Sequence, residues 1–108
     1  MLMAKLIVIY PYPANVDEFE KAYTNEHIPL AMEKIRGMSK FVASRVVVTP
    51  DGSQPPFYRI AELHFPSMSA LKETASSAGL QEAAAHAVSI STGGAPHFLI
   101  AEEETTEF

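Results

Sequence analysis

The feature that most constrains the fold of this chain is an apolar stretch near its start. Residues 3–10 read Met-Ala-Lys-Leu-Ile-Val-Ile-Tyr, which is β-branched and almost continuously apolar. A strand with one face in water alternates apolar and polar residues, whereas a strand covered on both faces is apolar throughout. Pro11 and Pro13 end the stretch. The chain therefore needs helices on one face of this strand and a second layer on the other.

A helix is predicted to follow, because Asn15 is a good N-cap and Glu18 stands three residues later, close to a capping box. Pro29 is expected to interrupt this helix and to push Ile28 out of the α region. A second short helix then begins at Pro29 and ends at Gly37. The apolar stripe of these helices consists of Val16, Phe19, Tyr23, His27 and Leu30.

The rest of the chain predicts a hairpin, helices and a last strand. Phe57 to Phe65 reads as a strand with Tyr58, Ile60, Glu62 and His64 on one face. Gly79 is expected to break the helical region after it. The predicted segments are a strand at 39–49, a turn at 50–56, a strand at 57–65, a helix from Ser67 to about Ala78, a helix at 80–88 and a strand at 97–103.

This order, βαββαβ, is the split βαβ arrangement and predicts an α+β, ferredoxin-like fold with a four-stranded antiparallel sheet. At 108 residues the chain is expected to form one domain, residues 1–108. Both helices cover one sheet face, so the apolar second face must meet something else. The simplest partner is the same face of a twin subunit, which gives a homodimeric α+β barrel. The alternative is a monomer with one apolar face exposed.

Composition excludes several classes of protein. The formal net charge is −5 and no basic stripe occurs, so nucleic acid and membranes are not expected partners. The chain has no cysteine, and its four histidines lack the spacing of metal ligands, so no metal or other cofactor is expected. No apolar run is long enough to span a bilayer, and the start does not resemble a signal peptide. A cytoplasmic location is the default prediction.

His27 is the most informative candidate for chemistry. It lies on the apolar stripe just before Pro29, and an imidazole there can donate or accept a proton. The alternative is a histidine that only hydrogen-bonds a backbone carbonyl freed at the helix break. Tyr10 and Tyr23 can each donate to an oxyanion, but such tyrosines are more often core residues with a wet hydroxyl.

Glu62 and His64 form a second candidate pair on the strand at 57–65. They can act as a base and its orienting partner, or they can be a solvated edge or a contact at the dimer interface. Arg45 and Arg59 either clamp a carboxylate ligand or pair with an acid of the protein itself.

The run Tyr10-Pro11-x-Pro13, the segment Tyr23-x-x-x-His27-x-Pro29-Leu30 and Gly37-Met38 resemble the EthD family, named for ethyl tert-butyl ether degradation. The resemblance implies a dimeric α+β barrel related to muconolactone isomerases, cofactor-free monooxygenases and polyketide cyclases. It also implies that His27 lines a pocket.

Three functions follow from these residues and this resemblance. The first is cofactor-free proton transfer on a small apolar or aromatic oxygenated compound, by an isomerase, a cyclase or a monooxygenase-like enzyme. His27, Tyr23 and Tyr10 would be catalytic, and Phe19, Leu30, Glu62 and His64 would bind the substrate. The second is a non-catalytic binding or accessory protein of an oxidative degradation pathway. The third and weakest is haem handling, with His27 as axial ligand. A single positioned base supplies about 10²–10⁴-fold, too little to cleave an inert ether.

Overall fold

The computed structural model describes residues 3–108. Four strands and a series of helices alternate along the chain. In order they are β1 (Met3–Pro11), α1 (Val16–Ala22), the π-helix η1 (Tyr23–His27), α2 (Ile28–Lys34), β2 (Lys40–Arg45), β3 (Phe57–Phe65), α3 (Met68–Ala75), α4 (Ala78–Ile90) and β4 (His97–Glu103).

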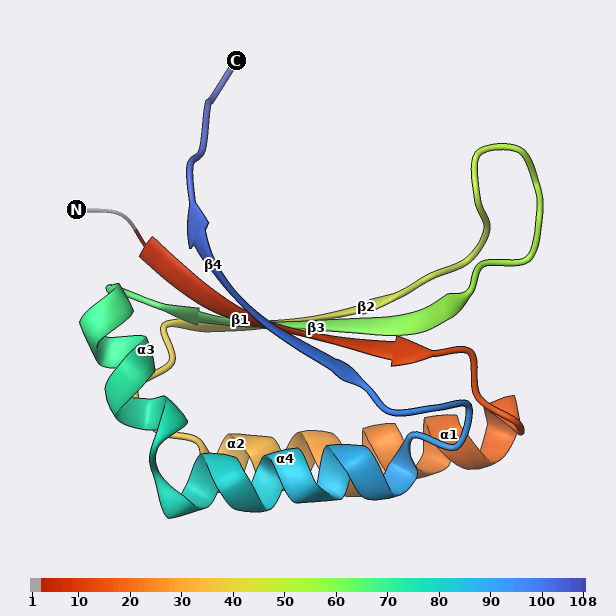
Figure 1. Ribbon diagram of the computed structural model, residues 1–108, viewed down its shortest axis with the longest axis horizontal. Coiled ribbons are helices and arrows are strands. Elements are labelled where there is room, and N and C mark those ends of the chain that lie inside the picture. Colours follow the sequence, from red (N-terminus) through yellow and green to blue (C-terminus); the bar gives the residue numbers. More distant parts are fainter. Residues whose placement is uncertain (1–2) are drawn as a thin grey trace.

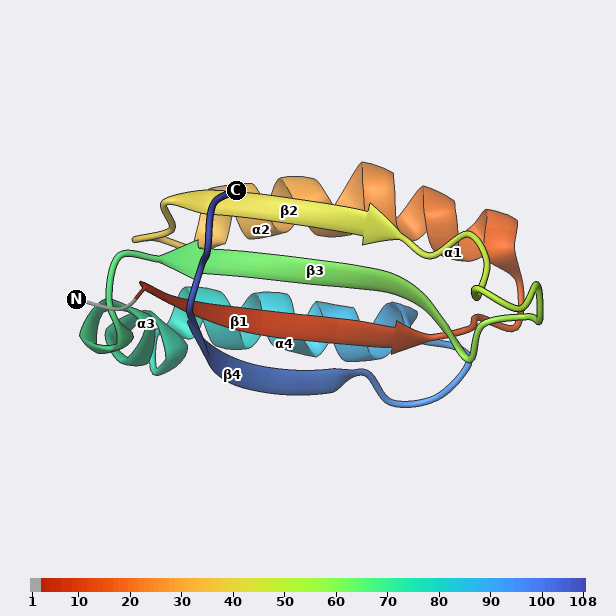
Figure 2. The same cartoon turned by 90° about the horizontal axis from the view of Figure 1, so that it is seen from above.

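The strands form one antiparallel sheet in the order β2-β3-β1-β4, so the first strand occupies a central position. Within residues 3–108, all helices lie on one face of this sheet, and the other face carries none (Figure 1). Figure 2 shows the same sheet from its uncovered side, with the helices behind it. The predicted α+β, ferredoxin-like architecture is confirmed.

The core lies between the sheet and the helices. The side chains that β1 directs to this face are the buried Ala4, Leu6, Val8 and Tyr10, and their partners on β3 are Phe65, Leu63, Ala61 and Arg59. A register shift after Tyr10 makes Tyr58 the extra residue of a β-bulge. Tyr58 consequently packs edge-on against Phe19 of α1, on the helix face, and does not share the face of Ile60 as the alternation predicted.

The prediction that Pro29 breaks the first helix is wrong. Ile28 stays helical at φ −59° and ψ −47°, and α2 continues directly from η1. The Ile28 N–H bonds to the carbonyl of Tyr23, five residues back, which is π-helical spacing. This wider turn accommodates the proline, whose ring would clash with the carbonyl four residues earlier in a regular α-helix.

Gly79 does not break a helix either. The break falls at Ser76 and Ser77, where Ser77 caps α4 by accepting from the Leu80 N–H. Gly79 lies within α4, and a Cβ built there would stand 2.0 Å from the Lys34 carbonyl oxygen. A glycine is required at this point because α2 and α4 approach closely.

The uncovered sheet face carries an apolar strip flanked by charged side chains. The end of β4 and the residues after it turn away from the helices and rise above this face (Figure 1), so they pass in front of β1 and β3 when the sheet is seen from that side (Figure 2). The apolar side chains of the strip are Ile7, Ile9, Val42, Ile60 and Leu99, as the register requires. Ile7 and Ile9 give the first strand the second apolar face that its sequence predicted, and Leu99 of β4, paired with Ile7, is 50% exposed.

Candidate active site

An apolar cavity of about 170 Å³ lies between the sheet and the helices. It is lined almost entirely by hydrocarbon, and its wall carries two polar side chains, Tyr10 and His27. The lining residues are Leu6, Val8, Tyr10, His27, Ala31, Ile35, Phe41, Ala61, Leu63, Ala75, Leu80, Ala83, Ala84, Ala87 and Phe98.

The cavity exists because small side chains line the side where α4 crosses the sheet. Ala83, Ala84 and Ala87 project from α4 toward the sheet, opposite Ala61 of β3. Alanine stabilises a helix but fills little volume, so a helix with an alanine face leaves space against a sheet. Phe98 of the edge strand β4 is 41% exposed and stands at the rim.

The π-turn positions His27 at the inner end of this cavity. Tyr23 and His27 stand four residues apart in η1, and their rings stack at a centroid distance of 5.7 Å. π-turns within helices occur frequently at functional sites. Pro29 therefore contributes to the site by favouring the turn that orients His27.

Both ring nitrogens of His27 have hydrogen-bonding partners. Nε2 lies 3.3 Å from the Tyr10 hydroxyl, and Nδ1 lies 2.9 Å from Nδ1 of His86. Burial lowers the pKa of His27 from 6.5 to about 4, and the neighbouring His86 adds to the effect. Burial likewise raises the pKa of Tyr10 above its usual value. At neutral pH the site therefore holds a neutral imidazole and a neutral phenol.

His86 is the site residue that sequence reasoning missed. It comes from α4, 59 residues from His27, and its ring lies almost parallel to that of His27, with an interplanar angle of 7°. Its Nε2 faces the Glu26 carboxylate at 3.7 Å. A signal was present in the sequence, because His86 is the histidine of the most alanine-rich helix and directly precedes Ala87.

The other first-half candidates pack around the site but do not line the cavity. Tyr23 is fully buried, stacks on Phe19 and meets Tyr10 edge-on. Burial, opposed by Arg59, raises the pKa of Tyr23 to about 12. Phe19 is core, and Leu30 is half-buried outside the lining. The structure thus brings Tyr10 and His27 together at the cavity, with Tyr23 behind them.

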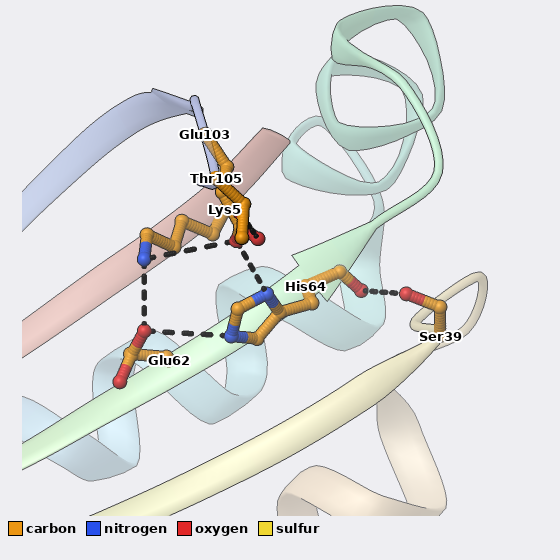
Figure 3. A network of polar contacts seen from close by, with 6 residues as sticks. All are labelled: Lys5, Ser39, Glu62, His64, Glu103 and Thr105. Atoms are coloured by element: carbon orange, nitrogen blue, oxygen red, sulfur yellow. Dashed lines mark hydrogen bonds and ion pairs between the residues drawn. The ribbon is translucent and has the colours of Figure 1, made fainter. Parts of the chain in front are cut away.

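Glu62 and His64 lie on the opposite face of the sheet from His27. His64 is 4% exposed and stands between two carboxylates, with Nε2 3.4 Å from Glu62 and Nδ1 3.4 Å from Glu103 (Figure 3). Lys5 bonds Glu62 at 3.0 Å and approaches Glu103 at 3.8 Å. Glu103 is the last residue of β4. A hydrogen bond from Thr105 lowers the pKa of Glu103, and the nearby Lys5 and His64 lower it further. Glu62 and His64 therefore do lie in contact, as the alternation of the strand predicted. The contact is on the uncovered face of the sheet, so neither residue is a partner of His27.

Arg59 is occupied by an acid of the protein itself. It donates to both Glu20 oxygens, at 2.9 Å and 3.0 Å from Nη2, and Tyr58 donates to the same carboxylate at 3.0 Å. Arg45 approaches Glu20 at 3.7 Å. The Arg59 guanidinium also lies over the Tyr23 ring, 4.9 Å from its centroid. This cluster ties α1 to β3, so of the two roles predicted for these arginines the structure shows the pairing with an internal acid.

Among residues 3–108, no group of three or more His, Cys, Asp or Glu side chains is placed to hold a metal ion. Axial ligation of haem by His27 would require it to give up its contact with Tyr10 or with His86. Within the same described residues, no helix combines the length and apolarity that crossing a membrane requires.

The EthD domain family model matches residues 12–89, and the chain belongs to this family. A relative from Rhodococcus erythropolis, described as an uncharacterized 11.0 kDa protein in the thcB-thcC intergenic region, is 30% identical over 103 residues. The match covers 95% of this chain and 97% of the relative. The crystal structure of an EthD family protein from Bacillus halodurans superposes with a TM-score of 0.85 at 27% identity. It covers 94% of this chain and 99% of that one.

A structure from Bacteroides fragilis, described as a dimeric protein of unknown function with a ferredoxin-like fold, has a TM-score of 0.65 at 17% identity. The match covers 94% of this chain and 96% of that one, and it shows the fold alone.

Proposed function

We propose that the cavity binds a small apolar or aromatic compound that carries an oxygen atom, and that His27 and Tyr10 transfer a proton to or from it without a cofactor. The observation that carries this proposal is the Tyr10–His27 pair in the wall of an otherwise apolar cavity. Pockets with an apolar lining and few convergent polar groups are the usual sites for small molecules.

The volume of the cavity indicates the size of the ligand. An engineered apolar cavity of about 150 Å³ in another protein binds benzene. At about 170 Å³, the cavity accepts one six-membered ring with a small substituent. A ligand of this size with one oxygen, such as a cresol or a cyclic ketone, places its ring against the alanines and its oxygen at Tyr10.

The same geometry supports the proposal of proton transfer. The 3.3 Å contact between the Tyr10 hydroxyl and His27 Nε2 is long for a hydrogen bond between these groups, so a ligand oxygen competes for the hydroxyl. When Tyr10 donates to a ligand carbonyl, His27 Nε2 is free to take a proton from the adjacent carbon. The electron pair of that C–H bond moves to form the enolate, and Tyr10 stabilises the enolate oxygen. Return of the proton to another carbon completes an isomerisation.

The second candidate is a binding or accessory protein of a degradation pathway. The low pKa of His27 favours this reading, because a neutral imidazole of pKa about 4 is a weak base. In that case Tyr10 and His27 hold the oxygen of the ligand and the bound compound leaves unchanged.

We also propose that the protein works in the cytoplasm as a homodimer through its uncovered sheet face. The apolar strip on that face, the half-exposed Leu99 and the dimeric ferredoxin-like relative support this arrangement. Pairing of two such faces gives the α+β barrel.

Binding is tested by titration calorimetry with p-cresol and toluene, which differ only in the hydroxyl group. The protein is expected to prefer p-cresol, and Tyr10→Phe is expected to reduce this preference about fivefold, which corresponds to one hydrogen bond of about 1 kcal/mol. Equal affinities for both compounds in the wild-type protein would contradict the role of Tyr10.

A filled cavity provides the matched control. Ala84→Leu places a larger side chain in the lining and is expected to abolish p-cresol binding, whereas Ala85→Leu, on the exposed side of the same helix, leaves it unchanged. Turnover is tested with 1,2-benzisoxazole. A base removes its ring C–H proton, the N–O bond breaks and 2-hydroxybenzonitrile forms. Release of this product above the buffer rate, lost in His27→Gln, distinguishes the enzyme from the binding protein.

A further inference from the structure

We infer that His86 is a proton-relay residue that accepts, through His27, the proton taken from the ligand and holds the resulting positive charge at the protein surface. This inference rests on the proposed function, since the relay serves the same cavity. It assigns a role to a residue that does not touch the ligand, and it gives the site a route between cavity and solvent.

Four polar groups form a continuous series from the cavity outward. Tyr10 and His27 line the cavity, His27 Nδ1 meets His86 Nδ1 at 2.9 Å, and His86 Nε2 faces Glu26 at 3.7 Å. Exposure rises along the series. The residues Tyr10 and His27 are 1% and 7% exposed, and the side chains of His86 and Glu26 are 25% and 66% exposed.

The arrangement of donors and acceptors favours one pair of resting tautomers. The Glu26 carboxylate lies 3.7 Å from His86 Nε2, beyond hydrogen-bonding distance, and its negative charge favours a proton on that nitrogen, so that His86 Nδ1 is an acceptor. The 2.9 Å contact then requires the His27 proton on Nδ1, which leaves His27 Nε2 to accept from Tyr10. Every donor in the series thus points outward and faces an acceptor.

The relay removes the difficulty that a buried imidazolium presents. The rings around His27 are those of Tyr10 of β1, Tyr23 of η1 and His86 of α4. None of these three side chains carries a negative charge that could stabilise an imidazolium. A cation on His27 is therefore poorly stabilised, as the pKa of about 4 expresses. On His86 the same charge meets water and the Glu26 carboxylate.

The transfer balances in two coupled steps. The ligand C–H proton moves to His27 Nε2 while the Nδ1 proton of His27 moves to His86 Nδ1. His27 stays neutral and His86, which keeps its Nε2 proton, becomes the cation. Reversal of both movements returns a proton to another carbon of the ligand and restores the original tautomers. An isomerisation therefore needs no net exchange of protons with solvent.

The relay is tested first without turnover, by ¹⁵N NMR of the imidazole rings as the pH is lowered from about 8. The expected result is that resting His27 carries its proton on Nδ1 and that His86 is the first of the two rings to become a cation. A His27 protonated on Nε2, or protonated before His86, overturns the inference. This readout stands even if the protein turns over no probe.

The second test compares His86→Gln with the wild-type protein. A glutamine oxygen can accept from His27 Nδ1 and hold the ring, but it cannot become a cation. We expect His86→Gln to bind p-cresol with unchanged affinity and to lose at least about tenfold of the 1,2-benzisoxazole rate. An unchanged rate overturns the relay and leaves His86 a positioning residue. Ala85→Gln, on the exposed side of the same helix, is the control. If the wild-type protein shows no rate, the enzymatic function fails, and the NMR result alone decides the relay.

Discussion

His27 makes folding stability depend on pH in a way that can be calculated. Its pKa falls from 6.5 in the unfolded chain to about 4 in the folded protein, because burial disfavours the imidazolium. Between these values the unfolded state binds more protons than the folded state. The free energy of unfolding therefore rises with pH across this window and is lower by a constant amount below it. A shift of this size corresponds to about 3 kcal/mol at about 1.4 kcal/mol per pKa unit.

The assay is urea unfolding followed by far-UV circular dichroism between about pH 4 and pH 7. The protein concentration is held fixed because the stability of an oligomer depends on concentration. Carboxylates also titrate in this range, so the informative quantity is the difference between wild type and His27→Gln. We expect this difference to change by about 3 kcal/mol across the window. Parallel curves for the wild type and His27→Gln would refute the burial argument.

Further predictions concern the sheet face, the helix contact and the tyrosine. Ile9→Glu places a charge on the uncovered face and should convert the proposed dimer to a folded monomer in sedimentation velocity. Val88→Glu, at an exposed position of α4, should stay dimeric. A dimeric Ile9→Glu would contradict the proposed interface. Gly79→Ala should lower the free energy of unfolding in urea by about 1–3 kcal/mol, because the new alanine Cβ would clash with the Lys34 carbonyl. An unchanged urea midpoint would show that α2 and α4 separate easily. Tyr10→Phe should retain the fold while slowing any 1,2-benzisoxazole turnover about tenfold or more, and an equal rate would exclude the phenol from the reaction.

Most of the fold was predictable because local patterns determine it. The strand at 57–65 and the strand at 97–103 have the predicted bounds, and Asn15 and Ser67 cap their helices as expected, accepting from Glu18 and Ala70. Strand alternation and capping depend on neighbours within a few residues, so the sequence carries them directly.

Two predictions about helix ends were wrong. Pro29 was expected to break a helix, and a π-turn accommodates it instead. Gly79 was expected to end a helix, and it allows two helices to touch. At Gly79 the local preference was opposed by packing against the Lys34 carbonyl of α2, a distant contact that no local pattern contains. At Pro29 the hydrogen bond from Ile28 to Tyr23, five residues back, keeps the chain helical.

The sequence by itself determined the order of the elements, the doubly apolar first strand, and the location of His27 on a buried stripe with Tyr23. Only the tertiary structure decided what His27 meets. Its partners Tyr10 and His86 lie 17 and 59 residues away in the chain, and the sheet separates it from Glu62 and His64. A periodic pattern shows which face of a helix is buried, but the group opposite that face depends on how separate elements pack. That packing, together with the volume left by the alanines of α4, makes the site.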